Sequence, residues 1–282
     1  MKKIHIIGLG LLGGSFALAL KKAKPEILFT GTDDNPQNLQ EALSRGIIQE
    51  HKPQADPDTD VIILATPINV IIPLLHSVLD QVHPGTLVMD FGSTKNSICQ
   101  SVSQHPHREN YLAVHPIAGT EYSGPKAAKE ELLSGKVLSV CEMDKTALGL
   151  KAMAYEIFEA LNMNLRFMEP YDHDLQFAYV SHLSHITSFM LGKTVLDKMN
   201  DNSHIMDMAG SGFSTTVRLA KSAPGTWAPI FVDNKKNILE ALDLYINNLA
   251  AFRDKINLED HEGLIQEMTE INKIGKILDY GA

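Results

Sequence analysis

Three glycines near the N-terminus are spaced for binding a phosphate through backbone N–H groups. They lie in Gly8-Leu9-Gly10-Leu11-Leu12-Gly13, a G-x-G-x-x-G sequence between an apolar run and an amphipathic segment. The first glycine allows a tight turn, the second lets the backbone approach a pyrophosphate, and the third permits close helix–strand packing. A helix beginning here also directs its positive dipole end at the anion. We predict a dinucleotide site with contacts at Gly8, Gly10, Leu11, Leu12 and Gly13; the alternative is a glycine-rich turn without a ligand.

An acidic residue further along the chain indicates which dinucleotide would bind. Asp33 stands twenty residues after Gly13, just beyond the apolar run Ile27–Thr32. A carboxylate there can hydrogen-bond the 2′-hydroxyl of a ribose and repels a 2′-phosphate. None of the next three residues is an arginine, so the sequence favours NAD over NADP. Thr66, which follows the run Val61–Ala65, is predicted as a further cofactor contact at the same edge of the sheet.

Two polar residues suited to acid–base chemistry follow later apolar runs. Ser93 comes after Leu87–Asp90, and His115 comes directly after Leu112–Val114. Pro116 disfavours helix at the residue before it, which predicts an imidazole held at a strand end. Histidine titrates near neutral pH and therefore suits general-base catalysis. We predict His115 as a base with Ser93 as a neighbouring hydroxyl; the alternative is a histidine with a structural role only.

A second group of polar residues lies in the later part of the chain. His182 and His185 are three residues apart and share one face of a predicted helix. Zinc would need a third ligand, which the segment 172–174 could supply, but the pair lacks the glutamate of an HExxH motif. Arg218 can hold a carboxylate bidentately or form a salt bridge with an acid such as Glu121. Substrate binding and a structural role are both open for the two histidines; we favour substrate binding and expect no metal.

The apolar runs alternate with amphipathic segments through the first half of the chain. Several runs are apolar throughout, as strands buried on both faces of a parallel sheet are. The alternation predicts a Rossmann-type, doubly wound α/β fold, which binds ligands at the carboxyl ends of its strands. The predicted strands are Lys3–Ile7, Ile27–Thr32, Val61–Ala65, Leu87–Asp90, Leu112–Val114 and Val137–Cys141, and the helices are Leu11–Lys21, Gln37–Arg45, Ile71–Val82 and Thr94–Ser103.

The strand pattern stops near Phe167, and helical patterns follow. Asp172–Met199 is predicted as one long helix, and helical periodicity returns after Pro224 and Pro229. We expect a dinucleotide-binding domain over residues 1–168 and a helical domain over residues 169–282. A heptad-like seam in the second domain is either an internal packing face or a homodimer interface. It comprises Ile238, Leu242, Tyr245, Leu249, Phe252 and Ile256.

Composition excludes several classes of protein. The 282 residues are 44% hydrophobic and carry a net charge of −9, which is ordinary for a globular protein and argues against a nucleic-acid partner. No uninterrupted apolar run reaches about 18 residues, so no membrane span is expected. The N-terminus lacks a signal-peptide cleavage site, and two cysteines, Cys99 and Cys141, suit a reducing compartment. We expect a cytoplasmic location.

Five segments together resemble the prephenate/arogenate dehydrogenases of tyrosine biosynthesis. They are Gly8–Ser15, Asp90–Lys95, His115–Glu121, Ser181–His185 and Arg218–Ser222. The resemblance extends over nearly the whole chain, and its histidine-containing segments are more specific than the glycine motif. It implies a Rossmann domain followed by an all-helical C-terminal dimerisation domain, a homodimer, and NAD as the cofactor. The implied reaction is oxidative decarboxylation of prephenate to 4-hydroxyphenylpyruvate, CO2 and NADH.

The resemblance also implies roles for individual residues. His115 would be the base that hydrogen-bonds the 4-hydroxyl of the substrate ring. Ser93 would orient His115, the substrate and the nicotinamide, so it counts as both a catalytic and a cofactor contact. The substrate-binding residues would be Arg218, His185, His182, Thr120 and Glu121, with Glu121 interacting with Arg218 near the mouth of the site.

Alternatives stay open at this point. An arogenate dehydrogenase would form L-tyrosine directly, although an imidazolium at His185 would repel the ammonium of arogenate. Another two-domain hydroxyacid or imino-acid oxidoreductase, or a non-catalytic dinucleotide sensor, would also contain the glycine motif. Tyrosine is a possible inhibitor because it has a carboxylate and a phenol in common with the product. No mutase segment precedes the motif and few residues follow the last helix, so we expect a monofunctional enzyme.

Overall fold

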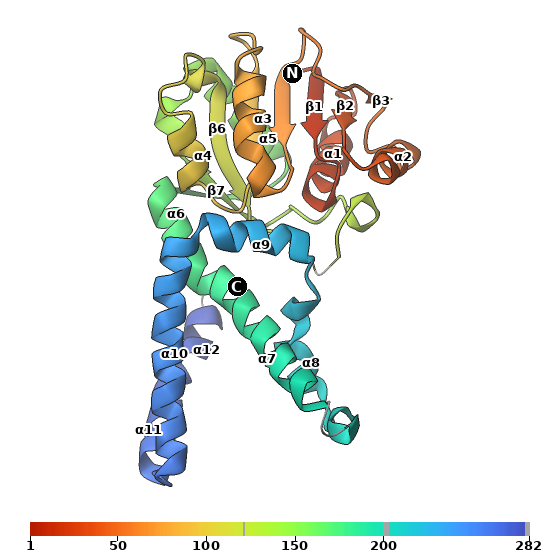
Figure 1. Ribbon diagram of the computed structural model, residues 1–282. Coiled ribbons are helices and arrows are strands. Elements are labelled where there is room, and N and C mark those ends of the chain that lie inside the picture. Colours follow the sequence, from red (N-terminus) through yellow and green to blue (C-terminus); the bar gives the residue numbers. More distant parts are fainter. Residues whose placement is uncertain (121, 200–202, 280–282) are drawn as a thin grey trace. The chain divides into compact units, whose positions relative to one another are not determined.

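The computed structural model of the chain describes residues 1–120, 122–199 and 203–279 (Figure 1). Contacts between residues divide the chain into two compact units, Met1–Lys235 and Lys236–Ala282. All of the predicted site residues that the structure describes belong to the first unit. Glu121 lies outside the described residues.

The first unit is built on one sheet. Its described strands run in the order β3-β2-β1-β4-β5-β6-β7-β8, and all neighbours are parallel except β6 and β7, which are antiparallel. This order places the glycine-rich end of β1 near the middle of the sheet. The strands are β1 Lys3–Ile7, β2 Leu28–Thr32, β3 Glu50–His51, β4 Val61–Leu64, β5 Leu87–Asp90, β6 Tyr111–Pro116, β7 Val137–Cys141 and β8 Asn164–Met168.

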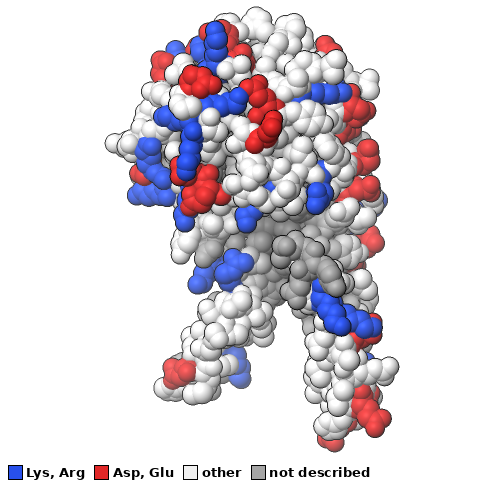
Figure 2. Space-filling model, turned by 180° about the vertical axis from the view of Figure 1, so that it is seen from behind, with Lys and Arg blue, Asp and Glu red and all other residues white. Residues whose placement is uncertain are grey.

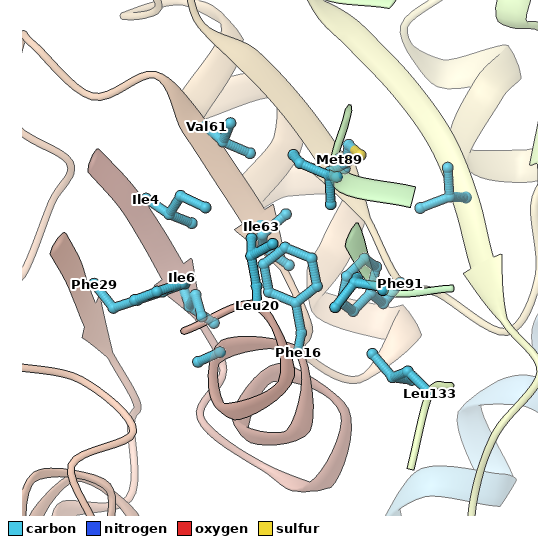
Figure 3. Close-up of a cluster of buried hydrophobic side chains, with 14 of the residues drawn as sticks. Ile4, Ile6, Phe16, Leu20, Phe29, Val61, Ile63, Met89, Phe91 and Leu133 are labelled. Carbon is cyan, nitrogen blue, oxygen red and sulfur yellow. The ribbon is translucent and has the colours of Figure 1, made fainter. Parts of the chain in front are cut away.

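Helices cover both faces of this sheet, and a hydrophobic cluster lies under each layer. On one face α1 (Leu11–Ala23) and α5 (Leu148–Ala160) pack on the strands. Figure 3 shows Phe16 of α1 beside Ile63 and Phe91 in this cluster. On the other face the cluster includes residues of α3 (Ile68–Leu79) and α4 (Asn96–Ser101). Successive strand residues alternate between the two clusters because side chains in a strand point to opposite faces. The remaining helix of this part is α2, Pro36–Ser44.

A continuous run of helix follows β8. It consists of α6 (Pro170–Phe177), a π-helical turn (Ala178–His182) and α7 (Leu183–Met199) without a break. After the undescribed residues 200–202 the chain forms α8 (Ser211–Thr216) and α9 (Pro224–Asp233). The last helices are α10 (Lys235–Asn257), α11 (His261–Ile271) and α12 (Lys273–Asp279), which make up most of the second unit.

The predicted fold class is confirmed, with differences in detail. The prediction of a wholly parallel sheet is wrong at β7, which returns antiparallel to β6. Strands β3 and β8 and helix α5 were not predicted, because β3 has two residues and β8 is largely exposed, so neither forms an apolar run. Helix α3 begins at Ile68, with Pro73 inside it, rather than at Ile71. The boundary predicted between residues 168 and 169 stays a prediction.

Two surface properties bear on the excluded classes of protein. Among the described residues, no helix combines the length and the apolar character needed to cross a membrane. On the face shown in Figure 2, Lys and Arg side chains lie beside Asp and Glu side chains.

Candidate functional site

The glycine loop between β1 and α1 has the geometry that its sequence predicts. Gly8 has φ +97°, and a Cβ there would lie 2.5 Å from the carbonyl oxygen of Ala65. A Cβ on Gly13 would lie 2.1 Å from the carbonyl oxygen of Gly8, so the helix can approach the strand only without a side chain. At Gly10 an added Cβ would meet no atom within 4 Å, which leaves open space in front of the loop. Because no side chain caps α1, its first N–H groups can bind an anion.

The carboxylate of Asp33 lies beside this loop. Its Oδ2 accepts a hydrogen bond from the Leu9 N–H at 2.8 Å, and its Oδ1 accepts from the Asn38 amide at 3.1 Å. The carboxylate is therefore fixed at the carboxyl end of β2, where it can accept hydrogen bonds from a ribose diol. Thr66 lies at the end of β4 next to Gly8, and its buried hydroxyl has no hydrogen-bond partner among the described residues. The glycine loop and the Asp33 carboxylate together fit a bound dinucleotide.

His115 is the last residue but one of the buried strand β6 and makes one side-chain hydrogen bond within the described chain. The residue is 8% exposed, and its Nδ1 lies 3.0 Å from Nε2 of His173 in α6. The Phe177 ring contacts both imidazoles and stacks on that of His173, with centroids 4.5 Å apart. Burial, and after it the proximity of His173, Lys95 and His182, lowers the pKa of His115 well below its usual value. His115 is therefore a neutral imidazole at neutral pH.

Asp174 joins this pair of histidines to the turn that contains Ser93. Its Oδ1 lies 2.8 Å from Nδ1 of His173 and accepts a hydrogen bond from the Lys95 N–H at 2.7 Å. Its Oδ2 accepts from the Asn96 N–H at 2.9 Å. One carboxylate on α6 thus holds both the base and the first residues of α4.

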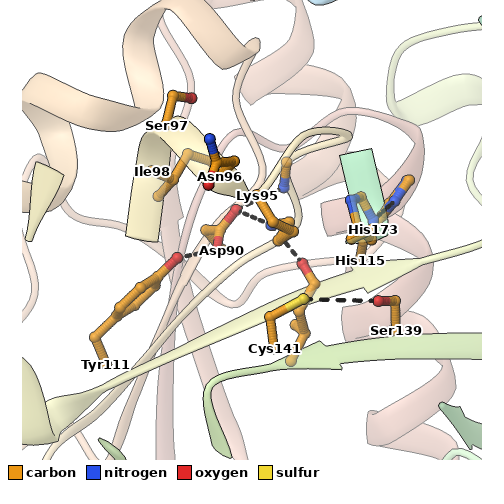
Figure 4. A network of polar contacts seen from close by, with 12 residues as sticks. Asp90, Lys95, Asn96, Ser97, Ile98, Tyr111, His115, Ser139, Cys141 and His173 are labelled. Carbon is orange, nitrogen blue, oxygen red and sulfur yellow. Dashed lines mark hydrogen bonds and ion pairs between the residues drawn. The ribbon is translucent and has the colours of Figure 1, made fainter. Parts of the chain in front are cut away.

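Beneath the turn lies a buried ion pair between Lys95 and Asp90 (Figure 4). Lys95 Nζ also donates to the carbonyl oxygen of Val114 at 2.8 Å, next to His115 in β6. The second oxygen of Asp90 accepts from the Tyr111 hydroxyl at 2.6 Å. Burial and the Asp90 carboxylate raise the pKa of Tyr111 well above its usual value, so the phenol stays protonated. The network fixes the ends of β5 and β6 relative to each other.

Ser93 is half-buried in the turn between β5 and α4. Among the described residues its hydroxyl makes no hydrogen bond, and the Nδ1 partner of His115 is His173 instead. The role implied for Ser93 as an orienting group for His115 stays a prediction for the liganded protein.

The two histidines after the π-helical turn have different surroundings. His182 is buried, and its Nδ1 accepts from the Asn234 amide at 3.1 Å, an amide that also donates to the Asp174 carbonyl oxygen at 2.7 Å. A neutral His182 therefore carries its proton on Nε2. Burial lowers the pKa of His182 to about 4.

His185 is half-buried, and its Nδ1 donates to the Ser181 carbonyl oxygen at 3.0 Å. Its ring stacks on the indole of Trp227, with centroids 3.3 Å apart. Burial, and to a lesser degree Arg218, lowers its pKa from the usual value. His185 is therefore uncharged at neutral pH. It has no positive charge that would repel the ammonium of arogenate and so favour the keto group of prephenate.

Arg218 and Thr120 lie on exposed segments. Arg218 begins a short 3₁₀ turn after α8, and Ser188 fastens this segment to α7 by donating to the Thr216 carbonyl oxygen at 3.0 Å. Thr120 accepts from the Tyr122 N–H at 3.2 Å in the loop that follows β6. Within the described chain, no three His, Cys, Asp or Glu side chains are grouped so that they could hold a metal ion.

Two family models match consecutive parts of the chain. The model described as "Prephenate dehydrogenase, nucleotide-binding domain" matches residues 16–166, and "Prephenate dehydrogenase, dimerization domain" matches residues 169–270. The chain belongs to the prephenate dehydrogenase family. The resemblance found in the sequence segments is thereby confirmed.

Relatives and solved structures of the prephenate dehydrogenase family agree with this assignment. The chain is 30% identical to prephenate dehydrogenase of Bacillus subtilis over 271 residues, which cover 93% of this chain and 72% of the relative. The structure of prephenate dehydrogenase from A. aeolicus in complex with hydroxyphenyl propionate and NAD+ superposes with a TM-score of 0.89, at 28% identity and 98% coverage of both chains. Arogenate dehydrogenase from Synechocystis gives 0.77, at 25% identity and 99% coverage of both.

Sequence reasoning missed three residues that surround His115 and His185. His173 and Asp174 were considered only as possible zinc ligands, and Trp227 was not considered. The weak signal for the pair is its place in the first turns of a helix that begins at Pro170 and follows the last strand. His173 is 58 residues from His115 in the sequence, which hid the contact.

Proposed function

We propose that the chain catalyses the NAD-dependent oxidative decarboxylation of prephenate to 4-hydroxyphenylpyruvate and CO2 in tyrosine biosynthesis. The observation that carries the proposal is the neutral, buried imidazole of His115 near the carboxyl end of its strand. The glycine loop follows the carboxyl end of β1 in the same sheet. Membership of the prephenate dehydrogenase family supports it, as does the similarity to a solved relative whose complex holds NAD+ and hydroxyphenyl propionate.

The reaction balances without net uptake of a proton. The C4–H bond of prephenate breaks, and hydride leaves with both electrons, while the C4 hydroxyl proton moves to a base. The bond between the ring and its carboxylate then breaks, CO2 leaves, and the electron pair completes the aromatic ring. The phenolate oxygen recovers the proton. Because aromatisation drives the last step, the protein mainly has to position C4 and hold one proton.

The residues of the chain supply these functions as follows. His115 Nε2 accepts the hydroxyl proton and returns it to the phenolate. Ser93, in the adjacent turn, donates a hydrogen bond to the substrate or the nicotinamide. The loop that contains Thr120 and Glu121 borders the substrate.

Residues in the later part of the chain would bind the carboxylates of prephenate. Arg218 offers the planar donor pair that matches a carboxylate. His182 offers an Nε2–H, because the Asn234 amide occupies its Nδ1. A neutral His185 stacked on Trp227 would serve as an acceptor or as a wall of the site.

The cofactor site fits NAD. Gly8, Gly10, Leu11, Leu12 and Gly13 present backbone to the pyrophosphate, Asp33 borders the adenosine ribose, and Thr66 is a further cofactor contact beside Gly8. When bound, NAD supplies the nicotinamide that accepts the hydride. Fixation of the Asp33 carboxylate by Leu9 and Asn38 leaves a negative charge where a 2′-phosphate of NADP would lie.

A homodimer through the C-terminal helices belongs to the same proposal. The match to a dimerisation domain supports it. The apolar seam of α10 becomes exposed along its length, to 51% at Leu249 and 57% at Ile256, and a second copy would cover it. Two buried free cysteines suit a cytoplasmic location. Tyrosine would compete with prephenate at the carboxylate-binding residues.

An absorbance assay tests the proposal. NADH formation at 340 nm is followed with prephenate and with arogenate, each with NAD and with NADP. We expect turnover with prephenate and NAD, and inhibition when tyrosine is added at low prephenate concentration. Turnover with arogenate alone, or with simple hydroxyacids alone, would refute the assignment of substrate; NAD binding without any turnover would indicate a sensor.

A further inference from the structure

We propose that Asp174 and His173 form an orienting relay that fixes the proton of His115 on Nδ1 and leaves Nε2 as the base. The inference rests on the proposed function only in giving Nε2 a substrate; the hydrogen-bond chain itself is a property of the protein. His173 and Asp174 are positioning residues, since only His115 would touch the reacting atoms.

The Asp174 carboxylate determines which atom donates and which accepts in each hydrogen bond of the relay. The Asp174 carboxylate accepts from two backbone N–H groups, those of Lys95 and Asn96. An ionised carboxylate is only an acceptor, so the third hydrogen bond, at 2.8 Å, comes from a proton on Nδ1 of His173. A neutral His173 then has a lone pair on Nε2.

The same reasoning assigns the proton on His115. Nε2 of His173 can only accept, and it lies 3.0 Å from Nδ1 of His115, so this nitrogen must donate. Nε2 of a neutral His115 is then left with a lone pair. The residues that face the imidazole do not oppose this state, since the Lys95 charge is paired with Asp90 and the Asn234 amide donates to His182. Burial lowers the pKa of both relay histidines and keeps them neutral.

The relay also joins the two parts of the chain that the family models match. His115 lies in residues 16–166, and the relay residues open the helix that begins the match to residues 169–270. The same Asp174 carboxylate holds the N–H groups behind Ser93. One side chain therefore sets both the tautomer of the base and the position of the neighbouring hydroxyl turn.

A purely structural role is the competing explanation, because His173 is fully buried and stacks on Phe177. Two substitutions separate the explanations. His173→Phe keeps a ring of similar shape but removes the acceptor for the Nδ1 proton. His173→Gln loses the ring, yet its amide oxygen can accept the same proton.

The closing experiment combines kinetics with NMR. In ¹⁵N-histidine-labelled protein without ligands, the His115 ring, assigned by its absence in His115→Asn, should show a protonated Nδ1 and a bare Nε2. We expect His173→Phe to lose this single tautomer. It should also lower kcat by about 10- to 100-fold, which is the usual loss when the group that orients a metal-ligating histidine is removed. KM should change little. His173→Gln should recover most of both. His83→Gln, at an exposed histidine, is the matched control.

Several outcomes would overturn the relay. A proton on Nε2 of His115 in the wild-type spectrum refutes it without any activity measurement, even if the His173 variants do not fold. A wild-type kcat in His173→Phe, or an equal loss of kcat in His173→Phe and His173→Gln, would show that His173 has only a packing role. If wild type does not oxidise prephenate, the proposed function fails while the spectrum still decides the tautomer.

Discussion

The ammonium of Lys95 and the carboxylate of Asp90 form an ion pair that no solvent reaches, since both side chains are 0% exposed. The carboxylate also accepts hydrogen bonds from the Tyr111 hydroxyl and from the Gly92 N–H at 2.9 Å. The pair therefore lies at the centre of a network that extends to Gly92, next to Ser93, and to Val114, next to His115.

Lys95→Met should destabilise the fold strongly. The substitution leaves the Asp90 carboxylate buried without a counter-charge, which typically costs about 3–5 kcal/mol of unfolding free energy. Urea unfolding followed by circular dichroism measures the loss. Lys22→Met, which removes an exposed partner of Glu130, is the control and should unfold close to wild type. Equal midpoints for the two variants would contradict the structural importance of the buried pair.

His115→Asn should lower kcat by about 10²–10⁴-fold, the usual contribution of a general base. The asparagine amide can still donate to His173 in place of Nδ1, so the fold should persist, while Nε2 is gone. Steady-state assays with prephenate and NAD measure the change, and thermal melting checks the fold. A folded variant with near-wild-type kcat would remove His115 from the chemistry.

Arg218→Ala should raise KM for prephenate by roughly 10- to 100-fold, the equivalent of a charge-assisted hydrogen bond. Binding of a carboxylate is present in both ground and transition states, so kcat should change much less. Arg166→Ala, at an exposed position in β8, is the control. An unaltered KM would exclude Arg218 from the substrate site.

Two glycines of the same loop should respond differently to alanine. Gly13→Ala places a Cβ 2.1 Å from a backbone oxygen and should destabilise the fold by about 1–3 kcal/mol or more. Gly10→Ala meets nothing within 4 Å, so stability should be kept while the methyl group obstructs the pyrophosphate. We expect roughly a tenfold rise in KM for NAD, as for the loss of one strong hydrogen bond. Similar melting temperatures for both variants would contradict the close packing at Gly13.

His5 should make the fold sensitive to mild acid. It is fully buried in β1, where Nδ1 bonds Thr30 and Nε2 lacks a partner in the described chain, and burial lowers its pKa from 6.5 to about 4. The unfolded chain therefore binds the proton more readily, and stability falls as pH drops from about 6.5 to 4, by up to roughly 3 kcal/mol. His5→Asn should flatten this slope in urea unfolding, whereas His83→Asn should not. Parallel slopes in wild type and His5→Asn would refute the assignment.

The sequence predicts the parts of the site that local patterns determine. Gly8 and Gly13 are constrained by their own turn and by the strand next to it, so their spacing alone indicates the loop. His115 could be predicted because an apolar run and Pro116 place it at a strand end. The relay residue Asp174 depends on a packing contact between α6 and α4 that no spacing rule encodes. Strand β8 escaped prediction because it lies at the sheet edge, with three of its five residues exposed.

The π-helical turn at Ala178–His182 has a consequence for how this segment can change in evolution. It inserts a wider turn between His173, which contacts His115, and His185, which stacks on Trp227. A π-helical turn takes up one residue more than an α-helical turn, so deleting one residue within Ala178–His182 would restore an α-helix with little rotation of the side chains that follow. Deleting one residue from the regular helix on either side would instead rotate every later side chain by about 100° around the axis, and both contacts could not then be kept together. We therefore expect single-residue gaps between His173 and His185 in homologous sequences to fall within the π-helical turn.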